Sequence, residues 1–219
     1  MRVFTLAVGP LQACCYLVAP DGCPECAVID PGGDAELITE QVRIRKLAPR
    51  FLVLTHGHID HVEALAALKR AFPDAQVCIN ERDAPMLADA HACLAEWIGI
   101  PLEPCKPDRL LADGDIIALG GDTTGGRGEC LEVLHTPGHT PGGISLLVRQ
   151  EGRPAAVFSG DTLFAGGIGR TDFPGGSYQQ LIASIRTRLL ALPDDTRVYP
   201  GHGEPTTIGE ERATNPFLR

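Results

Sequence analysis

Residues 51–61 read FLVLTHGHIDH, and the interpretation of the chain begins from this stretch. Its first four residues form a short apolar run that is typical of a buried strand. Beyond residue 61, apolar residues recur at helical spacing from Val62 to Phe72, and Pro73 ends that segment. Open α/β sheets bind their ligands where strands end and helices begin. The stretch places four side chains that can bind a metal at such a position: His56, His58, Asp60 and His61.

Three later segments repeat one pattern, in which an apolar strand is followed by a glycine turn and a residue that can bind a metal. Their ends read Pro137-Gly138-His139, Ser159-Gly160-Asp161 and Pro200-Gly201-His202. Glycine lets the backbone turn sharply, so each side chain can reach a shared pocket. Imidazole and carboxylate groups together suit zinc, iron or manganese, whereas calcium and magnesium prefer shells of oxygen ligands. The sequence therefore predicts one metal centre built from seven residues.

Two other histidines are given no metal role. His135 lies four residues before His139, but Pro137 and Pro141 exclude the helix that would pair them. We interpret His135 as a structural residue or a neighbour of the ligands. His91 falls in a predicted helix without a partner, and Trp97 in the same helix is interpreted as a packing residue.

Length, charge and cysteine content limit the class of protein. The 219 residues predict a single domain over residues 1–219. The net charge of −9 and the lack of a basic run argue against nucleic-acid binding. No apolar run has the length of a membrane span or a signal peptide, so we expect a cytoplasmic protein that binds no membrane. The eight cysteines are expected to be reduced thiols, including the Cys23–Cys26 pair.

Hydrophobic patterning predicts an α/β protein in which strands and helices alternate. The predicted helices cover 34–47, with Asp34 as N-cap, 62–72, 81–98 and 178–190. The regions 101–109 and 160–176 are predicted loops, and the glycine-rich run 120–128 a flexible connection. A first strand ends at Gly9-Pro10, and the other predicted strands are 13–19, 26–29, 51–54, 76–79, 116–119, 130–134, 144–148, 155–158 and 197–199.

Four motifs together resemble those of the metallo-β-lactamase-fold hydrolases. They are THGHIDH (55–61), TPGHTPGG (136–143), SGDTLF (159–164) and PGHGEPT (200–206). The resemblance runs on to GEERATNPF (209–217), and it is strongest to the short, single-domain members of the glyoxalase II branch, the hydroxyacylglutathione hydrolases. It implies an αββα sandwich with two mixed sheets inside and helices outside.

The resemblance also implies roles for individual residues. His56, His58 and His139 would hold one metal ion, and Asp60, His61 and His202 a second. Asp161 would bridge the two ions, which we expect to be zinc, with iron or manganese as alternatives. Asp30 would orient a ligand histidine, although a turn-capping role is equally open from the residues alone.

Such a site indicates hydrolysis, with Asp60 and Asp161 acting through a metal-bound hydroxide. Two metal ions can lower the pKa of a shared water to about 7, so that hydroxide forms at neutral pH. A thioester suits this chemistry because its leaving thiol, with a pKa of about 8.5, departs without a proton donor. We therefore expect a small thioester of the S-lactoylglutathione type as substrate. The oligomeric state is left open.

Arg170 is the one residue predicted to bind substrate. It stands on the glycine-rich loop after Asp161, in Gly169-Arg170-Thr171-Asp172-Phe173, where the glyoxalase II pattern has a lysine. Its guanidinium can hold a carboxylate through two hydrogen bonds. The other interpretation is that Arg170 pairs with Asp172 or another acid and shapes the loop. The tyrosine that the pattern has near Arg170 is absent, and Gly203 and Glu204 stand where it has a second tyrosine. We expect no basic helical domain of the glyoxalase II type after residue 202.

Two other functions remain open from the sequence. The stretch 169–173 also resembles the persulfide dioxygenases, which share the fold but use one iron held by two histidines and an aspartate. The second alternative is a metal-dependent binding protein without catalysis.

Overall fold

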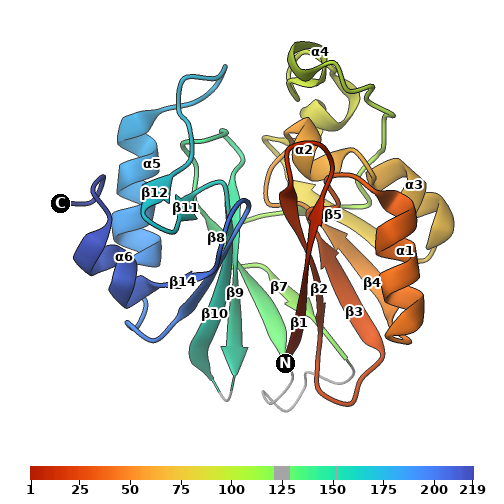
Figure 1. Cartoon of the computed structure of the whole chain (residues 1–219), viewed down its shortest axis with the longest axis horizontal. Helices are drawn as coiled ribbons and strands as arrows, with labels where there is room; N and C mark the ends of the chain where they lie inside the picture. Colours follow the sequence, from red (N-terminus) through yellow and green to blue (C-terminus); the bar gives the residue numbers. More distant parts are fainter. Residues whose placement is uncertain (121–128, 151) are drawn as a thin grey trace.

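The computed structural model of the chain describes residues 1–120, 129–150 and 152–219. Two six-stranded sheets lie face to face in the middle of the molecule, and helices cover both outer faces (Figure 1). Both sheets contain parallel and antiparallel pairs. This arrangement is the αββα sandwich that the motifs imply, and it confirms the predicted fold class. The predicted flexible connection falls largely on 121–128, outside the described residues.

The first sheet has the strand order β1-β2-β3-β4-β5-β6. It is antiparallel from β1 to β3 and parallel from β3 to β6. Helices α1 (Ala35–Ile44) and α3 (Leu65–Ala71) lie on its outer side in Figure 1. The strands are β1 (Arg2–Val8), β2 (Ala13–Ala19), β3 (Glu25–Ile29), β4 (Ala48–Val53), β5 (Gln76–Asn80) and β6 (Arg109–Leu111).

The second sheet has the order β14-β13-β10-β9-β8-β7. Helices α5 (Tyr178–Ser184) and α6 (Ile208–Thr214) cover its outer face, and a π-helical turn, Ile185–Leu189, extends α5. A short hairpin of β11 (Leu163–Phe164) and β12 (Gly167–Ile168) follows β10. The sheet strands are β7 (Ile116–Ala118), β8 (Cys130–His135), β9 (Ile144–Gln150), β10 (Arg153–Gly160), β13 (Arg197–Pro200) and β14 (Thr206–Thr207).

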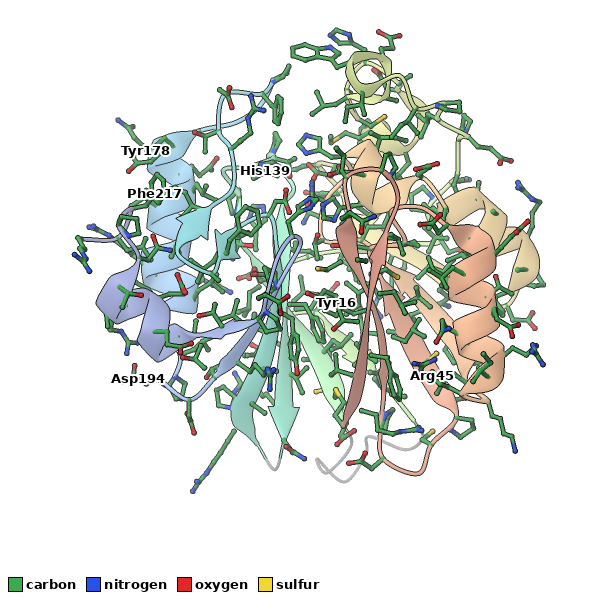
Figure 2. The ribbon with its side chains drawn as sticks, viewed as in Figure 1. Tyr16, Arg45, His139, Tyr178, Asp194 and Phe217 are labelled. Carbon is green, nitrogen blue, oxygen red and sulfur yellow. The ribbon has the colours of Figure 1, made fainter. Side chains whose placement is uncertain are left out.

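Strand β2 shows how the sequence separates the layers, because successive side chains on a strand point to opposite faces. Cys14, Tyr16 and Val18 enter the core between the two sheets, while Cys15 enters the core under the helices. The expectation that Cys14 and Cys15 face opposite ways is therefore confirmed. Tyr16 lies between the sheets in Figure 2, and its hydroxyl donates to the carbonyl of Pro200, at the end of β13.

The single helix predicted over 81–98 is wrong. The segment contains a 3₁₀ helix (Ala84–Ala88), then a turn, and then the short helix α4 (Ala95–Ile98). The carboxylate of Asp89 accepts hydrogen bonds from the backbone amides of His91 and Ala92, both at 3.0 Å. Such local bonds compete with helical ones. Leu94 then adopts a left-handed conformation with φ of 66°, which a continuous helix does not allow.

Other helix boundaries differ from the prediction. The helix predicted over 34–47 spans Ala35–Ile44. Asp34 occupies the predicted N-cap position in a left-handed conformation, but its side chain makes no capping hydrogen bond. The segment 62–72 is preceded by a separate helix, α2 (Ile59–Val62), and α3 begins only at Leu65. Strand β14 and helix α6 were not predicted, although the Thr207 and Glu210 capping box is a recognisable signal for α6. In the part of the chain that is described, no helix combines the length and apolar character needed to cross a bilayer.

Candidate metal centre

The ends of four strands meet at one edge of the sandwich. Strands β8, β10 and β13 run in the same direction in the second sheet, and β4 ends beside them in the first. His139, which Figure 2 labels, lies at this edge where the two halves of the molecule meet. The structure brings together all seven residues of the predicted centre, two of them on α2 and the others on the loops after the strands: His56, His58, Asp60, His61, His139, Asp161 and His202.

The first set of donors consists of His56, His58 and His139, which we call the three-histidine group. One ring nitrogen of each lies within 4.8 Å of the others. Nδ1 of His58 is 2.9 Å from Nε2 of His139. All three side chains are buried, and this group can offer three nitrogen ligands to one cation.

The second set consists of Asp60, His61 and His202, which we call the aspartate group. Its ligand atoms also lie within 4.8 Å of one another. Oδ2 of Asp60 is 3.2 Å from Nε2 of His202 and 3.8 Å from Nε2 of His61. This group can offer two nitrogens and one anionic oxygen.

Asp161 lies between the two groups. Its Oδ1 is 3.4 Å from Nε2 of His61, and its Oδ2 is 3.5 Å from Nε2 of His139. The same Oδ2 is 3.9 Å from Nε2 of His202. The two oxygens of one carboxylate thus face both groups, which is the geometry a bridging ligand needs.

Several polar atoms of the site have no hydrogen-bond partner although they are buried. They include Nε2 of His56, Nε2 of His61 and Oδ1 of Asp161. Buried polar atoms are normally paired, and an unpaired one costs about 1–3 kcal/mol. Nε2 of His61 and Oδ1 of Asp161 face each other at 3.4 Å without forming a hydrogen bond, and cations bound at the two groups would satisfy all three atoms. The residues therefore fit a pair of divalent metal ions.

The two groups differ in their protonation. Burial, with the nearby histidine rings, lowers the pKa of His56 well below its usual value and that of His58 to about 3. Burial also lowers the pKa of His61, but the carboxylates of Asp60 and Asp161 outweigh burial and raise it well above the usual value. Without metal, the three-histidine group therefore contains neutral His56 and His58, whereas His61 of the aspartate group carries a proton.

Hydrogen bonds behind the rings aim their free nitrogens at the site. Oγ1 of Thr55 donates to Asp30 at 2.6 Å, so it accepts from Nδ1 of His56 at 3.1 Å. Nδ1 of His139 donates to the backbone carbonyl of Arg170 at 2.7 Å. A ring that donates from Nδ1 presents the lone pair of Nε2 to a metal.

Asp30 orients the ring of His61 in the same way. Its carboxylate accepts from Nδ1 of His61 at 3.1 Å and from the backbone amide of Thr55 at 2.7 Å. Its backbone is left-handed, with φ of 51°, which is uncommon for a residue other than glycine. The sequence left two roles open for Asp30, and the contact with His61 supports the role of orienting a ligand histidine. Asp30 also lies within ligand distance of His56 and His61, but its oxygens are already engaged.

Asp83 is a residue of the site that sequence reasoning missed. Its buried carboxylate accepts from Oγ1 of Thr140 and the amide of Gly142, both at 2.6 Å, and from the amide of Gly57 at 3.3 Å. It therefore ties the loop of His56 and His58 to the loop of His139. Nothing in the sequence singled out Asp83, because it fell in the helix predicted over 81–98 and no metal-binding motif lies nearby.

Gly201, in the last motif, must be a glycine because neighbouring side chains lie very close to its backbone. A Cβ atom on Gly201 would lie 2.1 Å from Oδ1 of Asp161 and 2.8 Å from Cε1 of His61. Gly160, before Asp161, has φ of 48° and would place a Cβ atom 2.4 Å from Oγ1 of Thr55. Larger residues at either position would displace the side chains that the centre needs.

A cavity of about 360 Å³ opens directly above the candidate ligands. Five of the seven line its floor: His58, Asp60, His139, Asp161 and His202. Its walls come from three segments: Leu11 in the β1–β2 turn, Leu94 and Ile98 next to and in α4, and Phe164, Arg170 and Phe173 after β10. The volume is in the range of small-molecule sites.

Arg170 lies at this cavity, as predicted, and it is also paired with Asp172. Its Nε and Nη2 donate to the two carboxylate oxygens of Asp172 at 3.0 and 2.8 Å. Its guanidinium lies 4.2 Å from the centre of the Phe173 ring. Its role in substrate binding stays a prediction.

The structure also tests the roles predicted for His135, His91, Trp97 and the cysteines. Nε2 of His135 lies 3.2 Å from the carbonyl of Pro141, so His135 supports the His139 loop and stays outside both donor groups. His91 is exposed and lies 3.3 Å from Glu96. The interpretation of Trp97 as a packing residue is wrong, because 60% of its surface is exposed. All eight cysteines are free thiols.

Sandwich and site together define a metallohydrolase of the β-lactamase fold type. A family model of the metallo-beta-lactamase superfamily matches residues 8–202. The chain belongs to this superfamily.

The relatives agree with this assignment. A protein of Haemophilus influenzae named hydroxyacylglutathione hydrolase GloC is 42% identical over 220 residues, covering 100% of this chain and 98% of the relative. Two crystal structures are similar over 99% of this chain and nearly all of theirs. BLEG-1, a B3 metallo-beta-lactamase, has a TM-score of 0.90 at 36% identity over 99% of its own chain. TTHA1623 in a di-iron-bound form has a TM-score of 0.83 at 40% identity over 100% of its chain.

Proposed function

We propose that the chain is a dinuclear metal-dependent hydrolase that cleaves thioesters. One observation carries this proposal. Two groups of metal-binding side chains, joined by Asp161, form the floor of a cavity large enough for a small substrate. A substrate in the cavity would present its carbonyl group to both groups at once.

We propose that the three-histidine group holds one ion and the aspartate group the other, with Asp161 shared between them. Zinc suits both donor sets, and iron and manganese are the alternatives. When bound, the two ions would supply an activated water and polarise the carbonyl oxygen of the substrate. The protein itself would hold these ligands in place. Asp30 orients the ring of His61, and the carbonyl of Arg170 orients the ring of His139. Asp83 connects the two loops that carry the three-histidine group.

The leaving group favours a thioester over an amide. An amide nitrogen needs a proton donor in order to leave, whereas a thiol with a pKa of about 8.5 leaves as the thiolate. Among the described residues that line the cavity, the histidines and aspartates all belong to the two groups or the bridge. The one other ionisable side chain there is Arg170, which does not release its proton at neutral pH. The name of the Haemophilus influenzae relative, a hydroxyacylglutathione hydrolase, also supports a thioester.

The test is hydrolysis of a panel of thioesters, esters and amides by protein loaded with zinc. We expect turnover of thioesters above all, and loss of turnover after removal of the metal with a chelator. Turnover of the amides at a similar rate would contradict the proposal. A single iron per chain in protein prepared with excess metal, together with oxygen consumption on a persulfide, would favour the dioxygenase. Two bound metals without any turnover would favour a binding protein.

A further inference from the structure

The walls of the cavity are apolar, in contrast to its floor. Five of the residues above the candidate ligands are large and apolar: Leu11, Leu94, Ile98, Phe164 and Phe173. They come from three separate segments, so the apolar wall surrounds the site and is not a property of one loop.

Several of these apolar side chains remain exposed. Leu11 has 46% of its surface exposed and Ile98 has 38%. Trp97, the neighbour of Ile98 on α4, is 60% exposed, and its ring centre lies 6.3 Å from that of Phe173 across the cavity mouth. Scattered exposed apolar residues are ordinary, but a group of them around one concave site is typical of a binding surface.

Apart from the metal ions that the floor would hold, the walls of the cavity offer an anionic substrate little positive charge. Among the described lining residues, Arg170 is the one with a permanent positive charge. Both carboxylate oxygens of Asp172 already accept from it, and the Phe173 ring covers its guanidinium. Asp172 thus occupies the Nε and Nη2 edge of Arg170, and a substrate carboxylate would have to share the guanidinium with it through the other edge. On the opposite wall, Leu94 and Ile98 line the cavity and offer no charge.

We propose, on the basis of the thioesterase function above, that the preferred substrate is an uncharged thioester with an apolar chain that fills this cavity. The floor would receive the thioester group, and the side chains of Ile98, Leu94 and Phe173 would contact the chain. Arg170 contributes its stacked, charge-compensated guanidinium to the wall and does not hold a carboxylate. Each methylene group moved from water into such a wall is worth about a two- to fourfold gain in affinity.

The first experiment varies the substrate. Acetyl, butyryl and hexanoyl thioesters of N-acetylcysteamine, which is uncharged, are compared with the same acyl groups on glutathione, which carries carboxylates. We expect kcat/KM to rise about two- to fourfold per added methylene on the neutral carrier. We also expect each neutral thioester to be cleaved faster than its glutathione counterpart. Flat rates along the neutral series, or a preference for the glutathione thioesters, would overturn the inference.

The second experiment varies the wall. Ile98 is the last residue of α4 and has 38% of its surface exposed. Ile44, the last residue of α1, is an isoleucine with 57% of its surface exposed that does not line the cavity. Ile98→Ser should reduce the gain per methylene and leave the metal content near that of the parent. Ile44→Ser should leave the whole series unchanged. The same loss in both variants would show that the cavity wall is not the cause.

Arg170→Gln tests the charge. This substitution removes the charge and keeps a polar side chain that can donate hydrogen bonds. We expect KM to change by a similar, small factor for neutral and glutathione thioesters. A selective rise in KM for the glutathione thioesters would show that Arg170 holds an anion, and the inference would be wrong.

A binding measurement separates this inference from the proposed function. The S-hexyl thioether of N-acetylcysteamine cannot be hydrolysed, and its binding is followed by calorimetry at several temperatures. We expect a negative heat-capacity change, the mark of apolar burial, and weaker binding to Ile98→Ser. If the thioether binds in this way but no thioester is cleaved, the proposed function fails and the cavity assignment holds. If thioesters are cleaved but the thioether does not bind, the function holds and the inference fails.

Discussion

The carboxylate of Asp30 lies 3.1 Å from Nδ1 of His61, a residue 31 positions later in the chain. This contact holds the ring of His61 so that its Nε2 faces Asp60 and Asp161. Asp30 directly follows β3 and His61 lies on α2, so the contact links the first sheet to the metal-binding helix. Partners of this kind orient metal ligands and are important for affinity.

Asp30→Asn should weaken zinc binding by about 10–100-fold, because the amide replaces a carboxylate behind His61. Asparagine tolerates the left-handed backbone of residue 30, so the change affects the side chain and not the fold. The zinc dissociation constant, measured by competition with a chelator, is the readout. Asp34→Asn is the matched control, since Asp34 is also left-handed and its carboxylate accepts from the amide of Gly9. An equal loss of affinity in both variants would contradict the role of Asp30.

Asp161→Ala should reduce activity further than Asp60→Ala. Asp161 faces both donor groups, whereas Asp60 belongs to one, and a single remaining metal can still lower the pKa of water. We expect a difference in kcat/KM of at least about tenfold, equal to about 1.4 kcal/mol of transition-state stabilisation. Metal content should fall further in Asp161→Ala as well. Equal residual activity and equal metal content would refute the bridging role.

Asp83→Asn should weaken both the fold and the centre. The carboxylate accepts three hydrogen bonds from two loops, and an amide cannot accept all of them. We expect a loss of about 1–3 kcal/mol in the free energy of unfolding and a higher zinc dissociation constant.

Glu211→Gln is the control for Asp83. Glu211 is also buried and accepts from Gly166, Thr206 and Asn215, but it contacts neither donor group. It should lose similar stability with unchanged zinc affinity. A similar change in zinc affinity in both variants would mean that Asp83 acts through general stability alone.

Zinc binding should release protons. The pKa of His61 and that of His202 are raised in the metal-free protein, because the attraction of the nearby carboxylates outweighs burial. The pKa of Asp60 and that of Asp161 are lowered, so these groups release none. The metal-free form therefore binds more protons than the metal form, and zinc affinity should rise with pH.

Calorimetry in buffers of different ionisation enthalpy measures this proton release. We expect about one to two protons per chain near neutral pH. Release should fall to about zero once the pH exceeds the raised pKa values. Zinc affinity that does not depend on pH between about 6 and 8 would contradict the protonation state assigned to His61.

The positions of the candidate ligands could be predicted because each lies at the end of an apolar strand or in the motif that follows one. His56, His139, Asp161 and His202 lie at strand ends, and the strands that precede them were predicted to within a few residues. Alternation also separated the two faces of β2. These features are local, so a single sequence contains them.

The walls of the cavity could not be predicted in the same way. The segment 81–98 has helical composition, but the side chain of Asp89 and the left-handed Leu94 break the helix and turn Ile98 and Trp97 toward solvent. Asp83 depends on partners up to 59 residues away, which no local pattern reveals. The pairing of Arg170 with Asp172 was one of two open interpretations, and only the loop geometry shows the pair.

The measurement that tests the central claim most directly is a zinc titration of the metal-free chain. Bound metal per chain and the rate on a neutral thioester are followed in the same samples. The two donor groups joined by Asp161 predict that the rate reaches its maximum only when two zinc ions are bound per chain. A rate that is complete at one metal per chain, with no second ion bound in excess zinc, would contradict a dinuclear hydrolase.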